Sequence, residues 1–188
     1  MKLYRAHDHK RMPWKNGGGE TVEIAVFPPG AGVDDFDWRI SMATVASDGP
    51  FSIFPGIDRT LSILDGAGLS LKMEGGQCVA LNGASLPLSF AADIAVAATL
   101  PDGPVTDLNV MTRRGRYHHT VERVTGRFSA SKQTLSETVL VLVTGDALAT
   151  SGTQTVELAA LDAVEVVEAM TIEANHAVCY VIRIMPQG

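Results

Sequence analysis

Arginines stand inside segments whose other residues alternate between apolar and polar. Arg39 lies in "FDWRISMATV" (36–45), Arg59 opens the apolar run "TLSIL", and Arg113 ends "TDLNVMT". A guanidinium inside a β-structure must pair with an acid or bind an anionic ligand, because burial of a lone charge is costly. Its planar fork of donors suits bidentate contact with a carboxylate. The sequence therefore predicts either an anion site or arginines paired internally. The acids available as partners are Glu20, Glu23, Asp37, Asp58 and Asp107.

A second stretch with chemical character is "MPWKNGGGET" (12–21). Its glycines lack the lysine–serine pair of a nucleotide-binding loop, and no helix follows whose N-terminus could hold phosphate. A turn before a strand is the better interpretation, with Gly19 where the backbone approaches another group closely. Trp14, Lys15 and Asn16 then become one wall of a pocket whose floor carries the arginines.

Other catalytic chemistry has little support in the residues. There is no GxSxG nucleophile motif, no HExxH and no CxxC, and the five histidines sit beside no carboxylate cluster. Cys78 and Cys179 lie in apolar, strand-like surroundings, as reduced and buried thiols do. We therefore expect neither a metal nor an organic cofactor.

Strands must position these residues. Capped amphipathic runs are absent, and short apolar runs interrupted by Gly, Pro, Asn and Asp recur along the chain. In residues 21–27 the apolar side is predicted to be Val22, Ile24 and Val26, and residues 106–112 alternate in the same way. A period of two over such lengths is typical of half-buried strands, so we predict an all-β protein.

The segment 36–45 shows which side chains share a face. Trp38 and Ile40 fall on one side of the predicted strand, and Arg39 and Ser41 fall on the other. If one face packs on the core, the arginine face must look into a second enclosed space or into solvent. In a barrel that space is the interior, where a ligand can bind.

A weak similarity between two segments of the sequence suggests that the chain has two related halves. "LSILDGAGLSL" (61–71) resembles "LVLVTGDALAT" (140–150), and each is followed by further short apolar runs at similar spacing. We predict an N-terminal half at 1–115, which holds the pocket, and a C-terminal half at 116–188. Strands are expected to be exchanged between the halves.

The bulk composition narrows the function. The chain has 188 residues, a net charge of −6 and a pI near 5.3, which disfavours binding to nucleic acid. No run reaches the roughly 20 apolar residues of a membrane helix, and the N-terminus lacks the apolar core of a signal peptide. We expect a cytoplasmic protein with no membrane partner, and exposed barrel sheets are compatible with a homodimer.

Four motifs in order, "PWKNGGGETVEI", "FDWRISMA", "DGPFSIFPGIDRTLSILDGAGLSL" and "DLNVMTRRG", resemble the HutD/Ves family. The resemblance implies a cupin-type fold with two cupin-like halves, a bicupin. It also implies a link to histidine-utilisation gene clusters, no established catalytic activity, and a role in sensing urocanate or formylglutamate.

Alignment with the metal-binding cupin motif argues against a metal. With Gly66 as the final glycine of that motif, its histidine positions fall on Ile53 and Pro55, and its glutamate position falls on Arg59. None of these three binds a metal, and the cation favours an anion instead.

The family motifs also imply site residues. The positions that match them are Trp14, Lys15, Asn16, Gly19, Thr21, Glu23, Trp38, Arg39, Ser41, Phe54, Pro55, Gly56, Asp58, Arg59, Asp107, Asn109, Met111, Thr112 and Arg113. From these, the residues predicted to bind the ligand are Trp14, Lys15, Asn16, Gly19, Trp38, Arg39, Ser41, Arg59 and Arg113.

Two functions follow from these observations. The first is a non-catalytic protein that binds a small anionic metabolite, a carboxylate, and regulates histidine utilisation by sensing urocanate or formylglutamate. The alternative is a metal-independent hydrolase or isomerase of a small organic acid, with Glu23 or Asp58 as general base. That alternative requires a carboxylate that no arginine occupies. A third interpretation is that the motif residues only build the fold.

Overall fold

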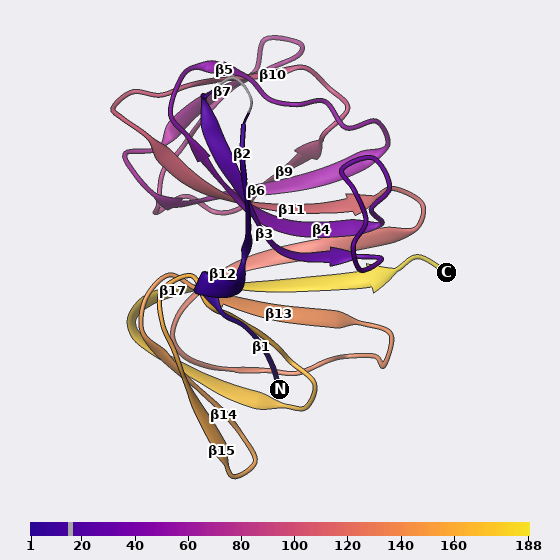
Figure 1. Cartoon of the computed structure of the whole chain (residues 1–188), viewed down its shortest axis with the longest axis vertical. Helices are drawn as coiled ribbons and strands as arrows, with labels where there is room; N and C mark the ends of the chain where they lie inside the picture. Colours follow the sequence, from indigo (N-terminus) through magenta and orange to yellow (C-terminus); the bar gives the residue numbers. More distant parts are fainter. Residues whose placement is uncertain (15–16) are drawn as a thin grey trace. The chain divides into compact units, whose positions relative to one another are not determined.

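The computed structural model describes residues 1–14 and 17–188, which are built almost entirely of antiparallel strands (Figure 1). The all-β prediction is confirmed. Within these ranges the one helix is a short 3-10 turn, η1 (Ala6–Asp8). No helix in the described part of the chain is long and apolar enough to span a bilayer. The chain divides into two compact units, Lys10–Arg116 and Met1–His9 together with Tyr117–Gly188.

The Lys10–Arg116 unit consists of two antiparallel sheets. The six-stranded sheet has the order β2 (Lys10–Pro13), β3 (Gly19–Phe27), β4 (Trp38–Val45), β11 (Val105–Arg113), β6 (Ile57–Asp65) and β9 (Leu88–Ala91). The four-stranded sheet has the order β5 (Gly49–Pro50), β10 (Val96–Thr99), β7 (Leu69–Met73) and β8 (Cys78–Leu81).

An apolar core joins these two sheets. Leu61 and Ile63 of β6 pack in one cluster with residues of β7, β8 and β10, among them Leu71, which is fully buried. Side chains two apart on a strand share a face, so Arg59 points to the same side of the sheet as Leu61. The interior of this unit is therefore apolar at one end of β6 and carries a cation at the other.

Strand β3 contains a bulge that the regular alternation of its sequence conceals. Glu23 pairs with Ser41 but Ala25 pairs with Ile40, so Ile24 is an extra residue in the ladder. After the bulge, side chains at even-numbered positions of β3 point to the opposite face of the sheet from those before it. Ala25 is buried, whereas Val26, predicted to share a face with Ile24, pairs with Arg39 and is only partly buried.

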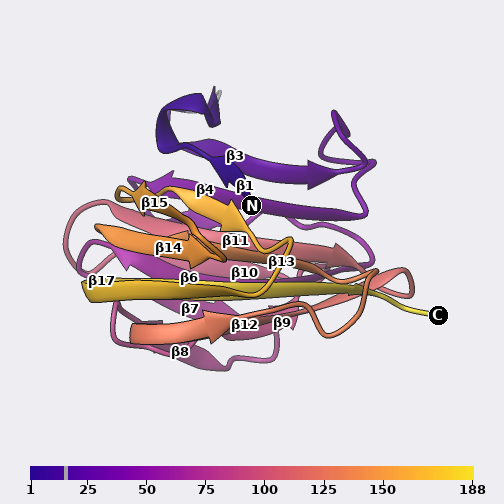
Figure 2. The ribbon, with the colours of Figure 1, turned by 90° about the horizontal axis from the view of Figure 1, so that it is seen from below.

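The second unit contains one antiparallel sheet. Its main path has the order β1 (Lys2–Tyr4), β16 (Ala163–Glu165), β13 (Thr138–Val143), β17 (Met170–Pro186), β14 (Ala147–Ser151) and β15 (Gln154–Leu158). Strand β12 (Tyr117–Ala130) pairs with β17, and the two run side by side in Figure 2. An ion pair of 2.7 Å between Arg5 Nη1 and Asp162 Oδ2 holds the N-terminal segment. The core cluster of this unit consists of hydrophobic residues.

The similarity between the segments at 61–71 and 140–150 corresponds to matching strand pairings. In the Lys10–Arg116 unit β6 pairs with β9 and β7 pairs with β8. In the other unit β13 pairs with β16 and β14 pairs with β15. In the second unit, the long strand β17 pairs with both β13 and β14. In the Lys10–Arg116 unit two separate strands take these places, since β11 pairs with β6 and β10 pairs with β7.

Both cysteines are free thiols. Cys179 is buried, as predicted, and burial raises its pKa to about 11. Cys78 is exposed, contrary to the prediction, because it begins β8 at the edge of the four-stranded sheet.

Candidate functional site

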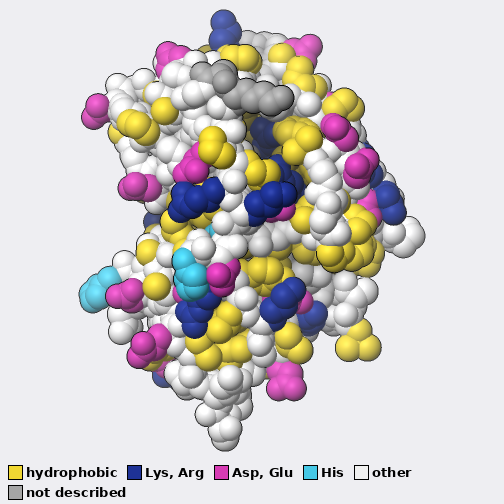
Figure 3. Space-filling model, in the orientation of Figure 1, with side chains coloured by type: hydrophobic (Ala, Val, Ile, Leu, Met, Phe, Trp, Pro, Cys, Tyr) yellow, Lys and Arg dark blue, Asp and Glu magenta, His cyan; other side chains and the backbone are white. Residues whose placement is uncertain are grey.

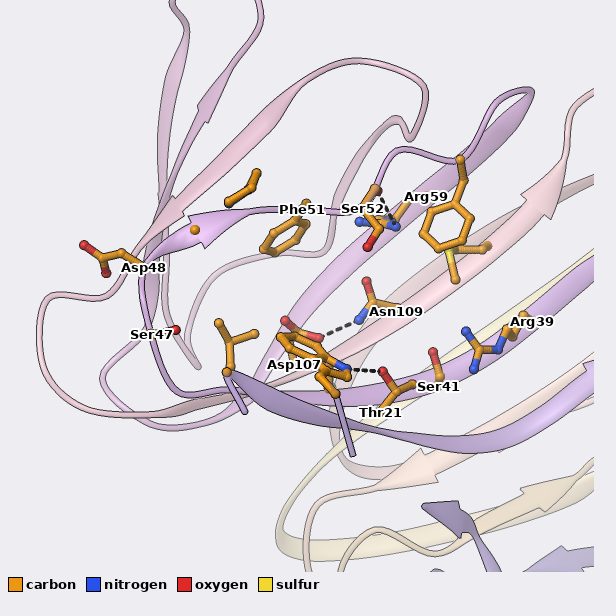
Figure 4. Close-up of a pocket in the computed structure, with 18 residues that line it drawn as sticks. Thr21, Arg39, Ser41, Ser47, Asp48, Phe51, Ser52, Arg59, Asp107 and Asn109 are labelled. Atoms are coloured by element: carbon orange, nitrogen blue, oxygen red, sulfur yellow. Dashed lines mark hydrogen bonds between the residues drawn. The ribbon is translucent and has the colours of Figure 1, made fainter. Parts of the chain in front are cut away.

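A cavity of about 550 Å³ lies in the Lys10–Arg116 unit. Its size is in the range of sites that bind small molecules. The polar and charged residues that line it are Thr21, Arg39, Ser41, Ser47, Asp48, Ser52, Arg59, Asp107 and Asn109 (Figure 4). In the space-filling view, basic side chains lie beside hydrophobic ones in a hollow of the face shown (Figure 3).

Strand register explains why these side chains converge. Met111 of β11 lies opposite Arg39 of β4 on one side and opposite Arg59 of β6 on the other. Opposite Cα atoms of adjacent strands are about 4.5–5.5 Å apart, so the two arginine backbones lie about 10 Å apart. Two residues along the same face, Asn109 lies opposite Ser41. The sheet thus presents two guanidiniums and two neutral polar groups to one cavity.

Arg59 is a buried cation with few polar partners. The residue is 5% exposed, and its Nε has no hydrogen-bond partner among the described residues. Its Nη2 lies 3.5 Å from the carbonyl oxygen of Ser52, a long contact. The guanidinium carbon lies 5.6, 5.2 and 5.9 Å from the ring centroids of Phe51, Phe54 and Phe90. These rings stabilise the cation without using its N–H donors.

The negative charge near Arg59 only partly compensates the positive charge of its guanidinium. Burial lowers the pKa of Arg59 to about 10, the negative charge of Asp107 opposes that shift, and the positive charge of Arg39 adds to it. A guanidinium with unused donors in a cavity is suited to bind an anion.

Asp107 is the buried acid of the cavity. It is 1% exposed, and among the described residues it forms no ion pair within 4 Å. Burial raises the pKa of its carboxyl to about 7, and three groups oppose the rise: the charge of Arg59, a hydrogen bond from Asn109, and the backbone of Ala43. The Asn109 amide donates that bond from Nδ2 to Oδ1 over 2.5 Å. Asp107 therefore changes its charge near neutral pH.

Arg39 differs from Arg59 because it has an acidic partner. Its Nε donates to Glu23 Oε2 at 2.8 Å, across β4 and β3, and both side chains are largely buried. No described residue accepts a hydrogen bond from the Arg39 Nη atoms. The charge of Arg39 is therefore neutralised by Glu23, but its Nη atoms keep hydrogen-bond donors for a ligand.

Trp14 and Thr21 form a further part of the cavity lining. The indole Nε1 donates to the Thr21 hydroxyl at 2.8 Å, which fixes the ring against β3 (Figure 4). Gly19 does not line the cavity but allows this arrangement. A Cβ at Gly19 would lie 2.0 Å from the carbonyl oxygen of Thr44 and 3.0 Å from the Trp14 ring. The predicted close approach of the Gly19 backbone is therefore to the protein itself.

The structure brings together four of the nine predicted ligand-binding residues: Trp14, Arg39, Ser41 and Arg59. Lys15 and Asn16 lie outside the described residues. Trp38 is not in the lining, because it faces the opposite side of β4 from Arg39 and stacks on Phe27 with ring centroids 5.8 Å apart.

Arg113 is also outside the lining, and its donors are occupied by backbone. Its Nε and Nη2 donate to the carbonyl oxygen of Phe36 at 3.1 and 2.9 Å, and Nη2 also donates to that of Asp34 at 3.1 Å. These contacts connect the end of β11 to the segment between β3 and β4. The side chain thus supports the fold beside the site.

The two acids proposed as general bases are both engaged by arginines. Glu23 pairs with Arg39, and Asp58 Oδ1 lies 2.7 Å from Nη2 of Arg114, outside the cavity. The condition set for the catalytic alternative is therefore not met by either acid. Among the residues that the structure describes, no group of three His, Cys, Asp or Glu gathers as metal ligands would.

Sequence reasoning identified Asp107 and Asn109 as motif positions but did not place them in the site. The alternation of β11 contains the signal, since 107, 109 and 111 share a face and Met111 pairs with both arginines. The phenylalanines around Arg59 were missed because they come from separate segments. Only the tertiary structure brings Phe51, Phe54 and Phe90 to one guanidinium.

Comparisons with known proteins give a consistent result. Residues 6–180 match the model of the HutD family. The chain is 43% identical over 113 residues to Protein Ves of Citrobacter koseri, in an alignment that covers 58% of each chain. It is 38% identical over 120 residues to an uncharacterised protein in the hutC 3' region of Pseudomonas putida, covering 62% of this chain and 60% of the relative. The matches thus span about three fifths of these curated relatives.

Solved structures extend the similarity to the whole chain. HutD from Pseudomonas fluorescens SBW25, in a formate condition, superposes with a TM-score of 0.83 at 31% identity and covers 100% of this chain and 99% of its own. A cupin 2 conserved barrel domain protein from Leptotrichia buccalis superposes with a TM-score of 0.59 at 11% identity, covering 89% of this chain and 88% of its own. The second match shows a cupin-like fold.

Proposed function

This chain belongs to the HutD family, and from that premise we propose that it binds a small carboxylate and acts in histidine utilisation. The relative in the hutC 3' region and the structural similarity to a protein called HutD support the link to histidine utilisation. The cavity with its arginines supports the binding of a carboxylate. The protein acts as a sensor of an intermediate of histidine breakdown and thereby restrains the pathway.

The observation that carries the proposal is the convergence of Arg39 and Arg59 on one cavity. Both lie opposite Met111, both are nearly buried, and both have N–H donors that no described residue accepts. Buried donors without acceptors cost free energy, which a carboxylate ligand recovers by accepting their hydrogen bonds.

Urocanate and N-formyl-L-glutamate both suit this arrangement. Urocanate carries one carboxylate and an imidazole, and N-formyl-L-glutamate carries two carboxylates and a formamide. The carboxylates suit the arginines, and the imidazole or formamide suits the neutral donors and acceptors of Ser41 and Asn109. The aromatic ring of Trp14 supplies an apolar wall.

Metal-independent catalysis is the second candidate function, and it would use an acid other than Glu23 and Asp58. With Glu23 and Asp58 paired, Asp107 is the cavity acid whose pKa, raised to about 7, suits a general acid or base. NMR of either ligand incubated with the protein distinguishes the two functions. Broadened or shifted ligand signals without product signals support binding alone, and the appearance of product signals supports catalysis.

Isothermal titration calorimetry with each ligand tests the proposed function. We expect wild type to bind at least one of them, and Arg39→Ala to weaken that binding at least about tenfold, because a charge-assisted contact is lost. Arg114→Ala is the matched control, since Arg114 is an exposed arginine of the same unit outside the cavity. Heats that are the same for wild type and Arg39→Ala with both ligands contradict the proposal. Thermal unfolding of each variant confirms that it is folded.

A further inference from the structure

The charges of the cavity nearly cancel before any ligand binds. Arg39 is neutralised by Glu23 of β3, and Arg59 of β6 and Asp107 of β11 line the same cavity with opposite charges. Asp48, in the segment before β5, adds a further negative charge to the lining, and its Oδ1 accepts the amide of Leu100 at 2.7 Å. With Asp107 ionised, the described residues give the cavity no net positive charge with which to attract an anion.

A bound carboxylate would also compete with Asp107 for the same cation. Among the described residues, Arg59 is the cation whose charge acts on Asp107, and the carboxyl is too buried for water to replace it. Two carboxylates close to one guanidinium in a site of low dielectric repel each other strongly. The simplest relief is that one of them becomes neutral, and the buried carboxyl is the one whose environment already favours its protonated form.

From this geometry we propose that Asp107 takes up a proton when the cavity binds a carboxylate, and that the protonated carboxyl donates a hydrogen bond to an oxygen of the ligand. The inference rests on the proposed function and specifies which carboxylates the cavity selects. The ligand class is a carboxylate that carries a second oxygen acceptor, such as N-formyl-L-glutamate. The carboxyl accepts from the Asn109 amide at Oδ1 and from the backbone of Ala43, and its protonated form adds the O–H that donates to the ligand.

The direction of the pH dependence follows from this scheme. Binding requires the protonated form of a group with a pKa of about 7, so affinity is highest below that pH and falls above it. Between pH 6 and pH 8 the protonated fraction, and with it the affinity, falls about tenfold. N-formyl-L-glutamate is the probe, because it has no group that titrates in this window, whereas the urocanate imidazole does.

The test is calorimetry of wild type with N-formyl-L-glutamate at pH 6, 7 and 8 in buffers of different ionisation enthalpy. We expect proton uptake to rise from near zero at pH 6 toward one proton at pH 8. Asp107→Asn, which imitates the neutral carboxyl, is expected to bind with an affinity that changes less than twofold over this range and without proton uptake. Asp93→Asn is the control, since Asp93 is an acid of the same unit outside the cavity whose pKa is lowered, and its profile should match wild type.

The outcomes separate the two proposals. Binding without proton uptake at pH 8 overturns this inference and leaves the proposed function in place. Absence of N-formyl-L-glutamate binding at every pH overturns this inference, and absence of urocanate binding as well overturns the proposed function. Should Asp107→Asn fail to fold, the proton uptake of wild type alone decides, and the 13C shift of the Asp107 carboxyl with and without ligand gives a second measurement.

Discussion

Arg59→Met is expected to weaken ligand binding strongly while leaving the protein at least as stable as wild type. At pH 6, where Asp107 is mostly neutral, we expect affinity for N-formyl-L-glutamate to fall about 100-fold or more, because loss of a buried charge partner costs 2–5 kcal/mol or more. Over the same change, the free energy of unfolding should stay constant or rise by up to about 2 kcal/mol.

Binding and stability are expected to respond differently because Arg59 is positioned to bind a ligand and does not stabilise the fold. Its Nε lacks a protein partner, its Nη2 contact is long, and burial lowers its pKa to about 10. A methionine side chain fills similar space between the phenylalanine rings and carries no charge to desolvate. The lost cation–π contacts offset part of the gain.

Urea unfolding and calorimetry at pH 6 measure both effects on the same sample. Arg11→Met is the matched control, because Arg11 is an exposed arginine of the same unit that pairs with Glu20. It should change neither quantity. A loss of stability above about 2 kcal/mol in Arg59→Met would show that the cation supports the fold, and unchanged affinity would remove Arg59 from the site.

Gly19→Ala is expected to have the second large effect, on stability. The added Cβ would lie 2.0 Å from the carbonyl oxygen of Thr44, which belongs to the β3–β4 ladder, and 3.0 Å from the Trp14 ring. Backbone cannot retreat without loss of ladder hydrogen bonds, so we expect a loss of about 3 kcal/mol, at the upper end for an overpacked site. The same shift should move Trp14 and weaken ligand binding.

Thermal unfolding together with tryptophan fluorescence measures this change. Gly83→Ala is the control, since a Cβ there meets no atom within 4 Å and the backbone has an ordinary conformation. Wild-type stability in Gly19→Ala would mean that β3 and β4 are farther apart at this point than the structure places them.

Periodicity alone grouped some of the residues that line the cavity, whereas the predicted ligand-binding residues came from the family motifs. It put Arg39 and Ser41 on one face of β4 and Trp38 on the other, although Trp38 was also predicted to bind the ligand. Applied to β11, it groups Asp107, Asn109 and Met111. These assignments depend only on the alternation of side chains along a strand, which local sequence determines.

What the sequence could not predict depends on contacts between distant segments. The bulge at Ile24 reverses the facing of β3, yet its residues alternate as regularly as those of an unbroken strand. Arg113 ends a strand on the arginine face, but carbonyl oxygens 77 and 79 residues away occupy its donors. The titration of Asp107 near neutral pH likewise depends on burial by the whole unit.

The structure of the protein bound to N-formyl-L-glutamate at pH 6 tests the central claim most directly. We predict a carboxylate oxygen of the ligand about 3 Å from Nε of Arg59, with a second ligand oxygen at hydrogen-bond distance from Asp107. A ligand bound outside this cavity, or one whose carboxylates contact neither Arg39 nor Arg59, would contradict the account.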